Sequence, residues 1–150
     1  MKGEELRQTR GMGAELYEQM QAAQCINLRS FRKDGTPVDT PLWVVPTGPR
    51  SFASYTDDRT IKVKRLRRNS QIEVAASDVW GRVSTPWFPA VCNFIRDEER
   101  RQVVFDLLRE KYGIHWHMSL LGSRLTGRVP HRLVLEYVLD DRPLYVPPAH

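Results

Sequence analysis

Short alternating runs of apolar and polar residues dominate the chain and predict strands more often than helices. Residues 25–32 alternate in part, and Asp34-Gly35 supplies hairpin turn chemistry before the extended run at residues 36–45. Pro37 and Pro41 cannot donate to a strand ladder, so this second strand should lie at a sheet edge or a bulge. Such an edge leaves backbone groups available to a ligand.

Further strand signals follow along the chain. Residues 51–56 and 71–76 are short runs between polar turns, and residues 131–139 form the last such run. Residues 80–95 hold a glycine and two prolines among apolar side chains, which predicts a bent strand pair around a turn.

Helix signals are fewer. Residues 3–23 contain strong helix formers, which two glycines should divide into a loose arm and a helix that covers a barrel end. Thr60 is a candidate N-cap for a short helix at residues 61–68. Residues 97–111 begin with acidic and end with basic side chains, which suits a helix dipole, and Gly113 is a candidate C-cap.

These elements predict a β-rich α+β domain, most simply a small antiparallel barrel with helices at its ends. The 150 residues suit a single domain at 1–150, with a helical arm at 1–23 and an extended tail at 140–150. No apolar run is long enough to span a bilayer and the polar start lacks a signal peptide's apolar core, so we expect a cytoplasmic protein without a membrane partner. Cys25 and Cys92 are expected to be buried thiols.

The charge distribution changes this picture, because it indicates an anionic partner. The net charge is +5, and residues 59–68 carry six positive charges and no negative one. A helix N-terminus offers unpaired N–H groups, so Thr60 followed by Lys62 would suit a phosphate. A solvated helix face and nucleic-acid contact remain alternatives. Nucleic acid is disfavoured because the segment is short, its apolar residues must face a core, and no aromatic-rich motif accompanies it.

Signals for other chemistry are weak. His115 and His117 lack a nearby carboxylate or cysteine ligand, so we expect no metal site. The chain has no nucleophile elbow and no glycine-rich nucleotide-binding motif. We therefore assign no catalytic side chain.

Two segments carry a family resemblance. They read Asp34-Gly35-Thr36-Pro37-Val38-Asp39-Thr40-Pro41-Leu42-Trp43 and Lys62-Val63-Lys64-Arg65-Leu66-Arg67-Arg68-Asn69. Together they resemble the pyridoxamine-phosphate-oxidase-like FMN-binding split barrels, and more closely the actinobacterial branch that uses the deazaflavin coenzyme F420. Lys111-Tyr112-Gly113 after the long helix is similar to that branch as well. The family's usual Asn-Pro is Asn69-Ser70 here.

The resemblance implies an antiparallel split β-barrel that binds its cofactor at a homodimer interface. It implies that residues 40–43 line the ring, that Tyr55 and Thr56 flank the ribityl chain, and that the basic segment holds the phosphate. The implied cofactor-binding residues are Thr40, Pro41, Leu42, Trp43, Tyr55, Thr56, Thr60, Lys62, Val63, Lys64, Arg65 and Arg68, the last of which could reach an acidic tail. Edge-strand and core packing is the alternative interpretation of Pro41 and Trp43.

The implied function is an oxidoreductase in which reduced F420 passes a hydride to a small organic substrate. The cofactor ring would carry that chemistry, so no catalytic side chain is required. An FMN-dependent enzyme of the same fold, a cofactor-binding protein without turnover, and a nucleic-acid-binding module are the alternatives. For the homodimer, the apolar residues Trp80, Val83, Trp87 and Phe88 are candidates for the shared surface.

Overall fold

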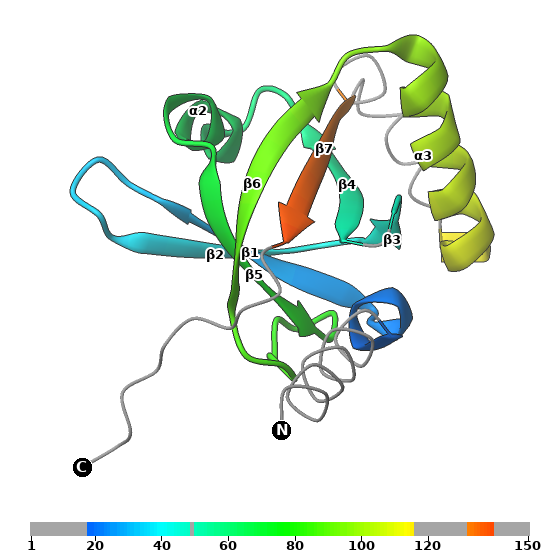
Figure 1. Cartoon of the computed structure of the whole chain (residues 1–150), viewed down its shortest axis with the longest axis horizontal. Coiled ribbons are helices and arrows are strands. Elements are labelled where there is room, and N and C mark those ends of the chain that lie inside the picture. Colours follow the sequence, from blue (N-terminus) through cyan, green and yellow to red (C-terminus); the bar gives the residue numbers. More distant parts are fainter. Residues whose placement is uncertain (1–17, 49, 116–131, 140–150) are drawn as a thin grey trace, which may run out of the picture.

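The computed structural model describes residues 18–48, 50–115 and 132–139, and these form a seven-stranded antiparallel sheet (Figure 1). The strands are β1 (Cys25–Phe31), β2 (Pro37–Leu42), β3 (Val45–Pro46), β4 (Ser51–Asp57), β5 (Gln71–Ser77), β6 (Phe88–Ile95) and β7 (Arg132–Leu139). Their order across the sheet is β2-β1-β5-β6-β7-β4-β3, so β2 and β3 are its two edges and the sheet is not closed. The predicted β-rich antiparallel architecture is therefore confirmed.

The first hairpin forms as its turn residues predict. The backbone N–H of Thr36 donates to the Asp34 carboxylate at 2.9 Å, and Gly35 has a φ of +87°, a conformation that favours glycine. Pro37 and Pro41 lie in the edge strand β2, as expected for residues that cannot donate to a ladder.

Two strand predictions need correction. Residues 36–45 are not one strand, because the chain stops pairing with β1 at Leu42 and starts pairing with β4 at Val45. Residues 80–95 do not form a strand pair, because only β6 is a full strand and Ser77↔Val83 is an isolated bridge. The Asp78 carboxylate accepts N–H groups of the following turn and holds that segment as a loop.

The helices α2 (Ile61–Arg68) and α3 (Glu98–Tyr112) match the sequence prediction closely. The Asp97 side chain caps α3 by accepting from Arg100 N, and Gly113 closes it with a φ of +51°. Thr60 occupies the N-cap position of α2, yet its hydroxyl donates to the Asp57 carbonyl at 3.0 Å and makes no capping bond. Residues 18–22 are helical; the arm at 1–17 and the tail at 140–150 lie outside the described residues.

Two cores hold these elements together. The inner face of the curved sheet encloses the larger one, which includes Leu66 of α2. The smaller one lies between the outer face and α3, which runs beside β3, β4 and β7 in Figure 1.

Cys25 and Cys92 are 5% and 4% exposed, which confirms that both thiols are buried.

Candidate functional site

Alternation along the strands divides the predicted site residues between two faces. Thr40 shares a face of β2 with Leu42, which is buried in the inner core. Thr56 shares a face of β4 with Phe52, another member of that core, and is 7% exposed. β2 also lies close to β4, with Cα atoms within 8 Å. The two threonine hydroxyls therefore belong to the inner side of the sheet, where its edge strand β2 approaches β4.

Lys62 and Arg65 of α2 reach this inner side. The Lys62 ammonium donates to Thr56 Oγ1 at 3.0 Å, and Arg65 Nε donates to Ser30 Oγ at 3.1 Å. The two side chains are three residues apart and so are neighbours on the helix surface. Val63 and Leu66 are buried and anchor α2 to the rest of the fold, which fixes the direction of the Lys62 and Arg65 side chains.

The environment of Lys62 disfavours its charge. Burial, and next the nearby Arg65 guanidinium, lower the pKa of Lys62 to about 8. Among the described residues neither Lys62 nor Arg65 has a carboxylate partner; each donates to a neutral hydroxyl. A bound anion would stabilise both cations, which is the electrostatic requirement of a phosphate site.

Three other basic residues of the segment do not join this pair. Lys64 is exposed and lies about 200° around the helix from Lys62. Arg59 forms an ion pair with Asp57 at 2.7 Å, which offsets its charge locally. Arg68 donates to the Phe31 carbonyl at 3.0 Å on the exposed side. The sequence shows one run of six charges, but the fold turns only part of it inward.

The predicted ring-lining residues have mixed surroundings. Thr40 is half-buried and Pro41 is exposed, whereas Leu42 belongs to the inner core. The Trp43 ring stacks on Tyr112 at a centroid distance of 4.4 Å and meets Tyr55 edge to face at 6.3 Å. Side-chain packing thus accounts for Leu42 and in large part for Trp43. A ligand along β2 would meet Thr40 and the backbone of the edge strand.

Tyr55 and Thr56 are neighbours in sequence but face opposite sides of β4. The Tyr55 ring packs on Phe105 of α3 at 6.1 Å, in the outer core, while Thr56 faces the Lys62 ammonium. Of the two residues, only Thr56 is brought together with the basic pair.

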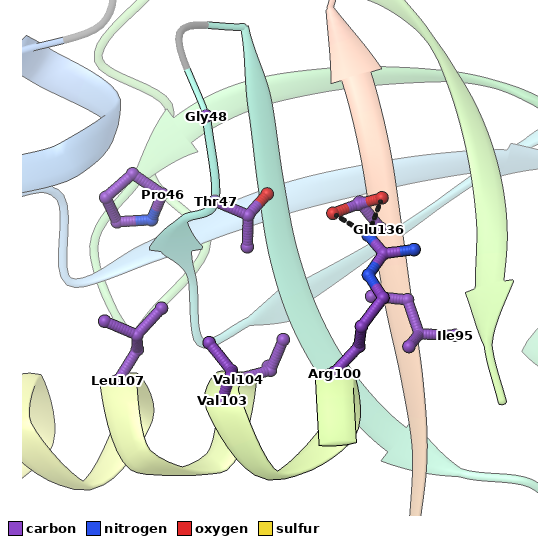
Figure 2. Close-up of a pocket in the computed structure, with 9 residues that line it drawn as sticks. All are labelled: Pro46, Thr47, Gly48, Ile95, Arg100, Val103, Val104, Leu107 and Glu136. Carbon is purple, nitrogen blue, oxygen red and sulfur yellow. Dashed lines mark hydrogen bonds and ion pairs between the residues drawn. The ribbon is translucent and has the colours of Figure 1, made fainter. Parts of the chain in front are cut away.

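A hollow of about 340 Å³ lies elsewhere, between α3 and the outer side of the sheet (Figure 2). Apolar side chains of α3 form one wall, and the Arg100–Glu136 ion pair at 2.8 Å closes one end. Its volume suits a small organic molecule. Sequence reasoning missed this hollow, because its walls come from distant segments and carry no motif. The lining residues are Pro46, Thr47, Gly48, Ile95, Arg100, Val103, Val104, Leu107 and Glu136.

The described residues contain no group of three or more His, Cys, Asp or Glu side chains able to hold a metal ion. His115 is exposed, and His117 lies outside the described residues. None of the helices in the described part of the chain has the length and apolar character needed to span a bilayer.

Comparison with known proteins identifies the fold. No protein-family model matches the sequence, and no curated protein matches it either. A protein of the pyridoxinephosphate oxidase family from Clostridium acetobutylicum, related to general stress protein 26, superposes with a TM-score of 0.61 at 14% identity, covering 86% of this chain and 84% of its own. The heme storage protein HutZ from Vibrio cholerae gives 0.61 at 15%, covering 85% and 89%. An FAD-binding protein from Mesorhizobium loti gives 0.57 at 15%, covering 85% and 87%.

At these identities the similarity shows the fold alone. The chain has the split-barrel architecture of pyridoxamine-phosphate-oxidase-like proteins, as the sequence resemblance implied. The names of the similar structures include a flavin binder and a heme storage protein, so the same fold serves different roles.

Proposed function

We propose that this protein is a flavin-type oxidoreductase that holds the phosphate of its cofactor between Lys62 and Arg65. The observation that supports the proposal most strongly is this pair of partly buried cations with hydroxyl partners and no carboxylate among the described residues. A protein that keeps such charges away from water without an anion bears a desolvation cost, which a phosphate would offset.

The donor set fits a phosphate group. Lys62 has three N–H donors and Arg65 has five, of which one each is occupied by a neighbouring hydroxyl. The Thr56 and Ser30 hydroxyls can rotate to donate once an anion is present. Thr60 marks the start of α2, where the helix dipole also favours negative charge, while its own hydroxyl proton is donated to the Asp57 carbonyl.

The other predicted residues take secondary parts in this proposal. Thr40 and the backbone of Pro41 would line the ring along the edge strand, with Leu42 and Trp43 supporting that wall from behind. Val63 and Tyr55 would act through backbone or packing, since their side chains face cores.

A bound flavin or deazaflavin supplies the hydride chemistry itself. The side chains of this chain then bind the phosphate, orient the ring and exclude water, and none has to act as an acid or a nucleophile. An enzyme of this kind therefore needs no catalytic side chain of its own.

We favour F420 over FMN as the cofactor. Arg68 lies on the exposed side of α2 and the chain carries a net charge of +5, which suits the acidic tail of F420. FMN has the phosphate but not that tail. The FAD-binding structure with the same fold supports flavin use, while the heme storage protein keeps binding without turnover as an alternative.

We also propose that the protein forms a homodimer, through a smaller surface than the one that the sequence predicts. Trp80 is 80% exposed and Val83 is 40% exposed, as a contact surface requires. Phe88 is 6% exposed and belongs to the inner core, and Trp87 lies against the Arg29 guanidinium at 3.9 Å. Of the predicted contact surface, only the loop that carries Trp80 and Val83 is therefore available to a second subunit.

Titration of the full chain with F420, FMN and an oligonucleotide is the decisive experiment. We expect saturable binding of F420, weaker binding of FMN and displacement of either by inorganic phosphate. Failure of both cofactors to bind would overturn the proposal. Oligonucleotide binding that persists with cofactor present and weakens with salt would instead support the nucleic-acid alternative.

A further inference from the structure

The chain makes a corner at Trp43-Val44 that has no strand partner. Pairing with β1 ends at Leu42 and pairing with β4 begins at Val45, so the intervening backbone belongs to neither ladder. Val44 is fully buried, with 0% of its surface exposed. Buried backbone N–H and C=O groups need hydrogen-bond partners, and here they must come from outside the sheet.

The last two residues of α3 provide those partners. Val44 N donates to the Tyr112 hydroxyl at 2.9 Å, and the Lys111 ammonium donates to Val44 O at 2.7 Å. The Tyr112 hydroxyl has one proton, which the 2.8 Å contact with the Gln24 carbonyl takes in preference to the 3.3 Å contact with Val44 O. One hydroxyl thus links the corner, the chain just before β1 and the end of α3.

Aromatic stacking adds a second constraint at the same corner. The Trp43 and Tyr112 rings are almost parallel, with an interplanar angle of 8° and a centroid distance of 4.4 Å. Tyr55 meets the Trp43 ring from another direction at an angle of 72°. The orientation of Trp43 is therefore set from two elements, and Trp43 directly follows the β2 residues proposed to line the cofactor ring.

The way in which α3 ends places the Lys111 and Tyr112 side chains at this corner. Gly113 ends α3 immediately after Tyr112, and its N–H donates to Arg109 O at 2.9 Å. A cation in the last turn is favoured by the helix dipole. Burial nevertheless lowers the pKa of Lys111 to about 8, and in the described part of the chain its ammonium contacts the Val44 carbonyl and the Tyr112 ring. A residue serving only to fill space would not need this ammonium.

We infer that Lys111 and Tyr112 are positioning residues that hold the Trp43-Val44 corner and so fix the ring-binding wall of β2. The inference rests on the proposed function, since it assigns that wall to the cofactor ring. The site then has two parts: α2 holds the phosphate, and the end of α3 fixes the wall for the ring. Substitutions at the second part should therefore affect ring binding and leave phosphate binding intact.

The test uses Tyr112→Phe, which keeps the ring stack and removes the hydroxyl, and Lys111→Met, which removes the ammonium. Arg109→Gln on the exposed face of the same helix is the matched control. F420 and FMN are titrated into each full-length variant, the absorption spectrum of the bound cofactor is recorded at saturation, and inorganic phosphate is titrated separately. Thermal unfolding is followed in parallel.

We expect Tyr112→Phe and Lys111→Met each to weaken cofactor binding about tenfold and to shift the bound spectrum, with phosphate affinity and the control unchanged. An unchanged affinity and spectrum in both variants would overturn the inference while leaving the proposed function standing. Equal losses of phosphate and cofactor binding would assign the two residues a purely structural role. Wild-type protein that binds phosphate but neither cofactor would instead refute the proposed function.

Discussion

Lys62 is a cation that the fold keeps partly out of water beside a neutral hydroxyl. Lys64, two positions later, lies on the exposed side of the same short helix. Replacing Lys62 with alanine should weaken cofactor affinity by about 10- to 100-fold, because a charge-assisted hydrogen bond contributes roughly 1.5–3 kcal/mol. Lys64→Ala should change affinity by less than about threefold, because exposed charges interact weakly. Calorimetric titration of both variants checks this, and equal effects at the two positions would contradict it.

The ionisation of Lys62 makes cofactor affinity depend on pH. Its pKa is lowered to about 8 in the free protein, and an anion favours the protonated form. Affinity should therefore be highest below pH 8 and fall as the pH rises through 8 toward 9.5. Lys62→Arg keeps the charge without titrating and should remove most of this dependence. Titrations between pH 6.5 and 9.5 measure it; the same slope in wild type and variant would show that another group is responsible.

At the scale of elements, α2 and α3 differ in how their first turns are satisfied. Asp97 caps α3 through a 3.1 Å bond from Arg100 N, whereas the Thr60 hydroxyl makes no cap bond in α2. Asp97→Ala should lower the free energy of unfolding by about 1 kcal/mol, and Asp97→Ser should restore most of it. Cofactor affinity should not change, because Asp97 and Tyr112 lie at opposite ends of α3.

Denaturant unfolding monitored by circular dichroism provides the measurement. A loss well below 0.5 kcal/mol, or an effect confined to cofactor binding, would show that the α3 cap contributes little to the fold. α2 depends instead on Val63 and Leu66, which anchor it to the core. Tertiary packing, more than capping, therefore sets the position of the proposed phosphate site.

For the whole molecule, the exposed apolar loop has a testable consequence. The Asp78 carboxylate and Gly81, with a φ of +80°, shape a turn that presents Trp80 to solvent. If this loop forms the subunit contact, the wild-type chain should sediment as a dimer and Trp80→Asp with Val83→Asp should sediment as a monomer. Far-ultraviolet circular dichroism should show an unchanged fold. A wild-type monomer, or a double variant that stays dimeric, would exclude this surface.

Local signals in the sequence determined much of the architecture. The Asp34-Gly35 turn, the prolines of β2 and the glycine that ends α3 act over a few residues, so they could be recognised without the fold. The basic run at residues 59–68 likewise identified α2 as the segment with the most charge. These features depend on backbone chemistry that neighbouring residues decide.

Contacts between distant segments were decided only by the tertiary structure. The pairing of Lys62 with Thr56 and of Arg65 with Ser30 depends on how α2 packs across the sheet. The corner at Val44 depends on a change of strand partner and on Tyr112, 68 positions away. No local periodicity encodes such distances, because the side chains meet only after the sheet has curved and the helices have packed. The sequence alone therefore indicated which segment is basic, and the fold decided which of its cations face inward.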